Sequence, residues 1–469
     1  MNLFPMRVLL ISANLCEDPY PVYPLGISVI AGALSEEGHS VRQLDLAPCA
    51  RDGSWKETLS EVYRTFRPGL IGLGIRNVDS VNSRDEKEES LLDFPLEVAR
   101  FCKENFPEQL ILGGAGFSLL PDLLLERSGA DYAVAGEGEE SVRELVRALE
   151  KGEKPVRRLL RGKRPLRQSA PLYQEDITEY YCRESHVIPL QSKRGCPFRC
   201  VYCSYPALEG RTIRARDPES VVRDMLSLQR KHPDAVLAFT DSVFNDPEGL
   251  FRDLLRILKK RSGEKSIPFS AFLTPAGLTD EDAALLKECG LVSAELGVDA
   301  ASDATLKAMG KSFSFREAAH ACGLLTRRQI RVTTNLIFGG PGETWDTVRE
   351  GIGNLLSVKN AFHLIFSGVR ILPGTPLLEL AKKEKLLPDS WDGLEERYYF
   401  AAGIDPEKLH RILSEAFADH PFCIYPPHAR QRELRMIHRI GLLAVNRFLK
   451  GEEKEKKEGE KEGEGGDLS

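Results

Sequence analysis

The segment SKRGCPFRCVYCSYP, residues 192–206, carries three cysteines at the spacing C-x3-C-x2-C, namely Cys196, Cys200 and Cys203. Structural zinc sites normally have four ligands, and no fourth cysteine or histidine stands close to this segment. A 4Fe–4S cluster that is held by three thiolates keeps one iron open for a substrate. The spacing therefore favours such a cluster over structural zinc or a chance group of buried thiols.

The chain around the three cysteines alternates between apolar strand-like runs and helical patterns. One helix is predicted from Pro218, with Asp217 as its N-cap, and another is predicted to start at Glu343. Six strand–helix units predict most of a (β/α) barrel, whose chemistry collects at the carboxyl ends of the strands. The cysteines follow the first strand, at that end. The six strand runs are VIPLQSKRG (187–195), AVLAFTDS (235–242), PFSAFL (268–273), LVSAELGVD (291–299), RVTTNLIFGG (331–340) and HLIFSGVRIL (363–372).

An earlier block shows the same alternation with five strand runs, which predicts an N-terminal flavodoxin-like, doubly wound α/β domain. In such a fold, ligands bind beyond the carboxyl ends of the strands. The runs are RVLLISA, VRQLDLA, LIGLGI, QLILGG and YAVAGEGE.

We expect five parts along the chain. They are an α/β domain (1–151), a basic, proline-broken linker (152–187), the partial barrel (188–394), a helical segment (395–450) and a disordered charged tail (451–469). No run of 18 apolar residues occurs, so no membrane span is expected. Ten cysteines are too few for a disulfide scaffold and indicate the cytoplasm. The net charge of −6 comes mostly from the tail and gives no argument for nucleic acid.

Four further segments share the order and position of known barrel motifs: FTDSVFN (239–245), LGVDAASDATLKAMGK (296–311), NLIFGGPGET (335–344) and RILPGTPL (370–377). With the cysteines, they resemble the radical S-adenosylmethionine superfamily. The resemblance implies that Asp241 receives the methionine amine, with Asp299, in place of the usual Glu, near the ribose. It also implies cofactor contacts for Glu295, Gly339, Gly340 and Glu343. Structural roles stay open, because Asp241 and Glu343 can cap helices and the glycines can simply turn the chain.

The N-terminal block resembles the cobalamin-binding domain that accompanies many such enzymes. The resemblance implies that cobalamin lies over the strand ends, near Arg76, Asn77, Gly113, Gly114, Gly116, Ser118, Gly136 and Gly138. The chain lacks the D-x-H-x-x-G motif whose histidine binds cobalt. We therefore predict no protein imidazole on the cobalt, and a cation from Arg76 beneath it that opposes a sixth ligand. An ordinary flavodoxin-like domain is the alternative.

The two resemblances together imply an enzyme with a 4Fe–4S cluster, S-adenosylmethionine and cobalamin, most often a methyltransferase (EC 2.1.1.-) acting on an unactivated carbon. Cobalamin-dependent rearrangement or oxidation, polar methyl transfer, and a cobalamin-independent radical enzyme are alternatives, and a cobalamin or cluster sensor is the non-enzymatic one. A flavodoxin- or ferredoxin-type protein is the expected one-electron reductant. The sequence identifies neither the small-molecule or peptide substrate nor a catalytic residue.

Overall fold

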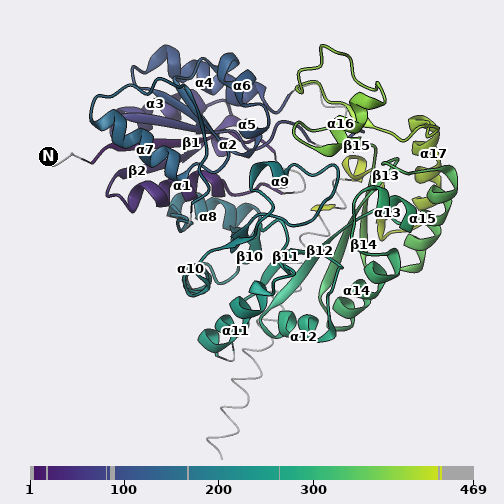
Figure 1. The fold of residues 1–469 in the computed structure, drawn as a ribbon. Helices are drawn as coiled ribbons and strands as arrows, with labels where there is room; N and C mark the ends of the chain where they lie inside the picture. The colour runs from purple at the N-terminus through teal and green to yellow at the C-terminus, as the bar shows by residue number, and fades with distance from the viewer. Residues whose placement is uncertain are drawn as a thin grey trace, which may run out of the picture.

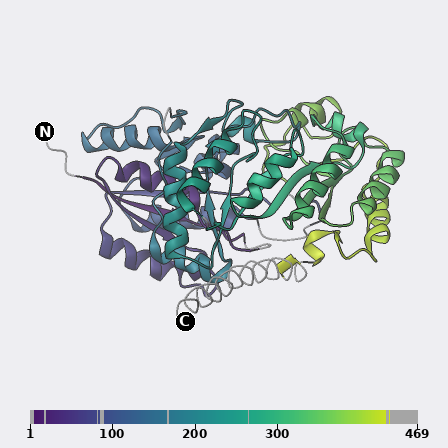
Figure 2. The ribbon, with the colours of Figure 1, turned by 90° about the horizontal axis from the view of Figure 1, so that it is seen from below.

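The chain folds into two α/β units that lie side by side (Figures 1 and 2). A computed structural model describes residues 5–16, 20–80, 82–84, 90–165, 168–263, 265–430 and 434–435. The predicted charged tail lies outside these residues. Within the described ranges, no helix combines the length and apolar character that crossing a membrane requires.

The N-terminal unit is built on a parallel sheet of six strands in the order β2-β1-β3-β4-β5-β6. The first five confirm the predicted doubly wound fold, because β1 lies between β2 and β3 as in flavodoxin-like sheets. The strands are β1 (Arg7–Ser12), β2 (Ser40–Asp45), β3 (Leu70–Gly74), β4 (Leu110–Gly113), β5 (Tyr132–Ala135) and β6 (Leu159–Arg161).

Helices cover both faces of this sheet because its strands are apolar on both sides. Val8 and Leu10 of β1 pack with α1 and α7, whereas Leu9 and Ile11 point to the face of α3, α4 and α6. The helices are α1 (Leu25–Ser35), α2 (Ala47–Ala50), α3 (Trp55–Phe66), α4 (Asp93–Asn105), α5 (Ala115–Leu119), α6 (Pro121–Ser128) and α7 (Glu139–Glu150).

The segment predicted as a linker contains regular structure. Strand β6 extends the N-terminal sheet by pairing with β5, and helix α8 (Glu175–Glu184) packs next to the first barrel strand. Residues 152–187 thus join the two units through short regular elements at 159–161 and 175–184, which the sequence did not predict. A strand of three residues is too short to show a periodic pattern in the sequence, and the prolines near it made a strand less expected.

The C-terminal unit is a parallel sheet in the order β17-β14-β13-β12-β11-β10-β7, which makes a partial barrel. All six predicted strands are present, and β17 adds a short seventh at one edge. The strands are β7 (Val187–Leu190), β10 (Val236–Phe239), β11 (Phe269–Leu273), β12 (Leu291–Asp299), β13 (Arg331–Phe338), β14 (Phe362–Ser367) and β17 (Cys423–Ile424).

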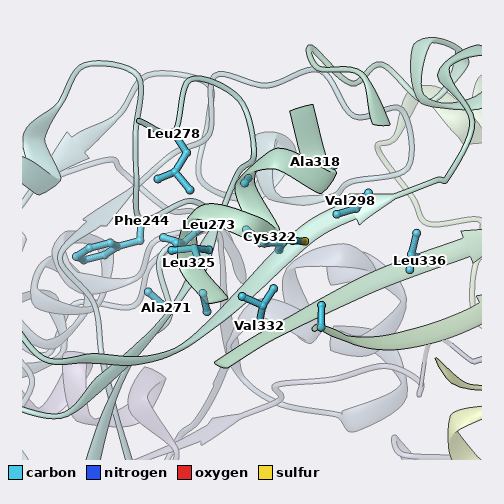
Figure 3. Packing of buried hydrophobic residues seen from close by; sticks show 14 of the residues in the cluster. Phe244, Ala271, Leu273, Leu278, Val298, Ala318, Cys322, Leu325, Val332 and Leu336 are labelled. Carbon is cyan, nitrogen blue, oxygen red and sulfur yellow. The ribbon is translucent and has the colours of Figure 1, made fainter. Parts of the chain in front are cut away.

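Helices pack on the outer face of the barrel sheet. The side chain of Asp217 accepts from the N–H of Ser220 and caps α10 (Pro218–Lys231) as predicted, whereas α15 (Trp345–Ser357) begins two residues later than expected, after the Thr344 cap. Figure 3 shows Ala318, Cys322 and Leu325 of α14 in the core with side chains of β12 and β13. The others are α11 (Leu250–Ser262), α12 (Asp280–Glu288), α13 (Asp303–Ala308), α14 (Phe315–Arg327) and α16 (Pro376–Lys383).

The segment from 395 is only partly helical, contrary to the prediction. Helix α17 (Pro406–Phe417) is flanked by β16 (Tyr398–Tyr399), which pairs antiparallel with β15 (Val369–Arg370), and by β17, which forms the barrel edge. Most of the predicted helix beyond residue 430 lies outside the described residues. The strands have two residues each, too few to leave a period in the sequence.

Candidate functional site

The three cysteines lie in one loop, residues 195–213, which we call the cluster loop. Its ends pair as the antiparallel strands β8 (Lys193–Arg194) and β9 (Arg214–Ala215). The N–H of Cys196 donates to the carbonyl of Gly210 at 3.0 Å, which folds the loop back on itself. Gly195 has φ +90°, and a Cβ there would lie 2.1 Å from the carbonyl oxygen of Thr212, so only glycine fits.

The structure brings the three thiols together. The pKa of Cys203 is raised to about 12, mainly by burial; the neighbouring Cys200 and Cys196 contribute to the rise, whereas a hydrogen bond from the N–H of Tyr205 and the ammonium of Lys311 oppose it. Burial also raises the pKa of Cys196. Cluster ligands must be thiolates, so cluster binding would release protons from this loop. No three His, Cys, Asp or Glu side chains of the described residues converge on a single ion, but cluster thiolates bind separate irons and need no such point.

The segment after the fourth barrel strand packs directly under the cluster loop. The N–H of Val201 donates to the carbonyl of Met309 at 3.1 Å, and a Cβ on Gly310 would lie 2.3 Å from the carbonyl oxygen of Arg199. Lys311 then reaches Asp299, the predicted ribose residue, which also accepts a hydrogen bond from Tyr202. The segment 296–311, which resembles the family motif, therefore holds the middle of the cluster loop in place.

Asp241 lies at the base of the same loop, where β8 and β9 pair; we call this pair of strands the neck of the cluster loop. It is 1% exposed, and its Oδ1 accepts from the N–H groups of Ser192 at 2.7 Å and Lys193 at 3.2 Å. Its Oδ2 accepts from the Ser192 hydroxyl and lies 3.3 Å from the Lys193 ammonium. These contacts occupy the lone pairs of the carboxylate. They favour a role in holding β8, and binding of the methionine amine by Asp241 stays a prediction.

The glycine-rich turn after β13 is held by Glu343. Its Oε2 accepts from the N–H of Gly339 at 3.2 Å, and its Oε1 accepts from Thr347 at 2.5 Å and from Thr305 at 3.2 Å. Burial raises the pKa of Glu343, and these hydrogen bonds oppose the shift. Added Cβ atoms on Gly339 and Gly340 would crowd protein side chains, among them Phe400 and Met309. Packing thus explains these glycines, and their contact with adenine stays a prediction.

Glu295 points from β12 into the barrel. Burial raises its pKa, and a hydrogen bond from Asn335 on the neighbouring strand opposes the shift. From the N-terminal unit, Tyr20 comes close enough that the charges of both Glu295 and Arg76 act on its hydroxyl. Glu295 and Arg76 therefore both lie near the Tyr20 hydroxyl, where the barrel and the N-terminal unit meet.

The main pocket, of about 400 Å³, opens at the carboxyl ends of β1, β3, β4 and β5. Its opposite wall comes from the barrel unit and includes Gln191, Tyr205 and Thr240. Aliphatic side chains and glycines line most of it, and the glycines are Gly26, Gly72, Gly74, Gly113, Gly114, Gly136 and Gly138. The two units thus enclose one deep, apolar, glycine-rich site.

Most predicted residues of the N-terminal unit line this pocket. Arg76, Gly113, Gly114, Ser118, Gly136 and Gly138 do so, whereas Asn77 and Gly116 do not. A Cβ on Gly116 would lie 2.9 Å from backbone atoms of Arg76 and Asn77, so this glycine allows α5 to approach the loop after β3. The Ser118 hydroxyl donates to the carbonyl of Gly114 at 2.7 Å and accepts from the N–H of Gly136 at 2.8 Å. It braces two loops, and phosphate binding by Ser118 stays a prediction.

Comparison with protein families assigns both units. Residues 190–352 match the radical SAM superfamily, and residues 11–146 match the B12 binding domain. The chain belongs to the cobalamin-binding radical S-adenosylmethionine enzymes. The first match implies a 4Fe–4S cluster and S-adenosylmethionine, and the second implies cobalamin.

Solved structures and curated relatives agree with this cobalamin-binding radical enzyme assignment. The radical S-adenosylmethionine methyltransferase TsrM from Kitasatospora setae superposes with a TM-score of 0.78 at 23% identity, over 90% of this chain and 91% of its own. The cobalamin-dependent radical enzyme OxsB gives 0.71 at 16% identity, over 94% and 72%. Tryptophan 2-C-methyltransferase from Streptomyces laurentii is 25% identical over 75% of this chain and 71% of its own.

The residues present fit the cofactors of this cobalamin-binding radical enzyme. Gly72 and Gly74 lie in the pocket wall, where an added Cβ would meet Leu10 at 2.7 Å or Ile27 at 3.1 Å, so the wall is closely packed and apolar, which suits the apolar parts of a large cofactor. Glu139 lies in the same wall and is 1% exposed; its Oε1 lies 2.7 Å from Nη1 of Arg194, whereas its Oε2 accepts no hydrogen bond from the described residues. Such an oxygen can receive an amide N–H of the corrin.

Sequence reasoning missed several residues of this site. Gly72 and Gly74 stand inside a strand, where a glycine often marks a close ligand or backbone, and that signal was available. Arg194, Arg214 and Glu137 join the two units near the pocket, and their pairing has no local sequence signal.

We predict that cobalt in this enzyme carries no protein nitrogen. Among the described residues, no histidine lines the pocket, and exposed Arg76 stands where the ring should pass. A guanidinium has no lone pair to offer a metal. Electron paramagnetic resonance of bound cob(II)alamin should therefore show no hyperfine splitting from a protein nitrogen. Arg76→His should introduce that splitting, because imidazole is a good ligand.

The neighbouring variant Asn77→His is the matched control, since Asn77 does not line the pocket and should leave the signal unsplit. Splitting from a protein nitrogen in the unmodified enzyme would show that another residue binds cobalt and that Arg76 does not lie beneath it.

Proposed function

We propose that the enzyme is a methyltransferase that uses cobalamin and a radical S-adenosylmethionine site to methylate an unactivated carbon. The observation that carries the proposal is the shared pocket, whose walls come from the cobalamin-binding sheet and from the cluster-bearing unit. Bound cobalamin supplies a transferable methyl group, and the cluster with S-adenosylmethionine supplies a radical that activates the carbon. A carbon acceptor agrees with the printed activity of the tryptophan 2-C-methyltransferase relative.

The protein's own residues hold and shield these groups. Cys196, Cys200 and Cys203 bind the cluster in the proposal, and the glycine-rich wall accepts the cobalamin. In the proposal, Asp299, which Lys311 and Tyr202 hold in position, contacts the ribose of S-adenosylmethionine. In the proposal, the substrate binds near Glu295 and Tyr20, where the two units meet, so that both cofactors reach one carbon.

A partner must deliver electrons to the cluster. We propose a flavodoxin- or ferredoxin-type protein in the cytoplasm, where low-potential carriers of this kind keep an iron–sulfur cluster reduced. The ten cysteines, none in a disulfide in the structure, agree with a reducing compartment.

A second outcome has one supporting observation. The chain is 24% identical to the anaerobic magnesium-protoporphyrin IX monomethyl ester cyclase of Rubrivivax gelatinosus, over 74% of this chain and 64% of the relative. An oxidative cyclisation or rearrangement is therefore the alternative reaction for the same two cofactor sites.

The test uses S-adenosylmethionine with a deuterated methyl group. The reconstituted, reduced enzyme with cobalamin should transfer that methyl group to cobalamin, which mass spectrometry of the extracted cofactor detects. It should also release 5′-deoxyadenosine slowly without substrate. Deoxyadenosine with no labelled cobalamin would contradict methyl transfer and favour the rearrangement. Labelled cobalamin with no deoxyadenosine, even in the presence of substrate, would favour polar methyl transfer.

A further inference from the structure

The neck of the cluster loop places two cations side by side. Strands β8 and β9 close the loop, and Arg194 stands opposite Arg214 in their antiparallel register. Like charges directly opposite each other on neighbouring strands repel and destabilise the pair. A pair of strands with two residues each forms few backbone hydrogen bonds that could offset this repulsion.

One carboxylate from the other unit joins both cations. Glu137, in the loop after β5, lies with its Oε2 3.1 Å from Nη1 of Arg194 and accepts from Nη1 of Arg214 at 2.8 Å. The second oxygen of Glu137 accepts from Nη2 of Arg214. Glu137 and Arg194 are each 8% exposed, so water and salt screen their charges little.

The same contacts continue into the cluster loop. Nη2 of Arg214 donates to the carbonyl of Glu209 at 2.9 Å, and the Glu209 carboxylate accepts from the N–H of Gly195 at 3.0 Å. Gly195 directly precedes Cys196. A second acid of the N-terminal unit, Glu139, lies 2.7 Å from Arg194. The position of the first cluster cysteine is therefore tied to acids of the cobalamin-binding sheet.

We propose that Glu137 is a positioning residue through which the cobalamin-binding domain closes the neck of the cluster loop. Seated between the two arginines, Glu137 removes their repulsion and holds residues 195–213 in the conformation that presents the three cysteines. Without it, the neck opens more often and the loop releases iron. The inference rests on the proposed cluster site and is independent of the reaction that the cluster serves.

The test compares Glu137→Gln, which keeps the shape and removes the charge, with Glu144→Gln as control. Glu144 lies in α7 and pairs with Lys163 at the exposed surface. Hydrogen–deuterium exchange of peptides from 195–213 is measured in cluster-free protein. We expect Glu137→Gln to speed exchange in this loop by at least about tenfold, with peptides from β1 to β5 unchanged. Glu144→Gln should exchange like the unmodified protein. An unchanged exchange rate of the 195–213 peptides in Glu137→Gln would overturn the proposal.

A rescue variant separates charge repulsion from general damage. In Glu137→Gln/Arg214→Gln, one of the facing cations is gone, so loop exchange should return most of the way to the unmodified rate. Arg214→Gln alone loses the contact with the Glu209 carbonyl but leaves Arg194 paired with Glu137, so it should speed exchange clearly less than Glu137→Gln does. A double variant no slower than Glu137→Gln, or an Arg214→Gln variant as open as Glu137→Gln, would contradict the proposal. If Glu137→Gln does not fold, the double variant is compared with the unmodified protein: loop exchange at least about tenfold faster would contradict the proposal, and exchange close to the unmodified rate would support it.

Iron retention is the second readout. After anaerobic reconstitution, Glu137→Gln should lose iron to a chelator faster than Glu144→Gln, and the rescue variant should lose it more slowly than Glu137→Gln. Equal rates in the two single variants would overturn the link to the cluster. If even the unmodified protein retained no iron, the proposed cluster site would be wrong, whereas the exchange experiment would still report on the neck.

Discussion

Replacement of Cys196, Cys200 and Cys203 together by alanine should leave a protein that binds no cluster. The unmodified protein, reconstituted anaerobically, should hold about four iron and four sulfide per chain, as expected of a 4Fe–4S site. The triple variant should lose the visible thiolate-to-iron absorption and the iron, because the three thiols of the cluster loop are its protein ligands in our assignment. Release of 5′-deoxyadenosine should disappear with the cluster.

Cys49→Ala/Cys182→Ala is the control for the loss of thiols. Both residues are half-buried and lie outside the cluster loop, so this variant should keep its iron. The thermal midpoints of the metal-free proteins show whether either set of changes harms the fold. Full iron and sulfide in the triple variant would place the cluster elsewhere and refute the assignment.

Gly113→Leu should abolish cobalamin binding while the fold remains intact. Gly113 ends β4 and lines the pocket, and a Cβ there meets only the carbonyl oxygen of Val134, at an ordinary 3.7 Å. The leucine side chain would therefore occupy space that the cofactor needs. We expect the dissociation constant to rise at least about 100-fold, or about 2.7 kcal/mol, measured by equilibrium dialysis with hydroxocobalamin.

The size-matched control is Gly353→Leu on α15. Gly353 is exposed, and its added Cβ would meet nothing within 4 Å, so cobalamin binding should stay unchanged. Thermal midpoints of the two cofactor-free variants should both stay near that of the unmodified protein. Normal affinity in Gly113→Leu would show that cobalamin does not use this pocket.

Short apolar runs that alternate with helical patterns along the chain predicted both sheets. A strand such as RVLLIS has buried side chains on both faces, so a continuous apolar run identifies it. The C-x3-C-x2-C spacing of the three cysteines likewise identifies them as candidate cluster ligands. Strands β6 and β17 were not predicted because two or three residues carry no period, and their place depends on the neighbouring strand.

The roles of single carboxylates depend on partners that the sequence does not reveal. Asp241 was predicted to receive a ligand, and the structure surrounds it with Ser192 and Lys193, which lie 49 and 48 positions earlier. Glu137 stood within a glycine-rich run that suggested a cofactor loop, and its contacts with two arginines appear only after the two units have come together. Pairing of this kind is a property of the tertiary structure.

The pocket walls, drawn from both units, bear on the order in which the holoenzyme is made. The sheet that supplies the glycine wall emerges first during synthesis, and domains generally fold as they emerge. A growing chain can therefore take up cobalamin while that wall is still open to solvent. In the finished protein this wall faces the barrel unit, and the interface between the units includes the buried ion pair between Asp79 and Arg370, at 2.6 Å. We therefore expect cobalamin to load faster onto the growing chain than onto the finished apoprotein.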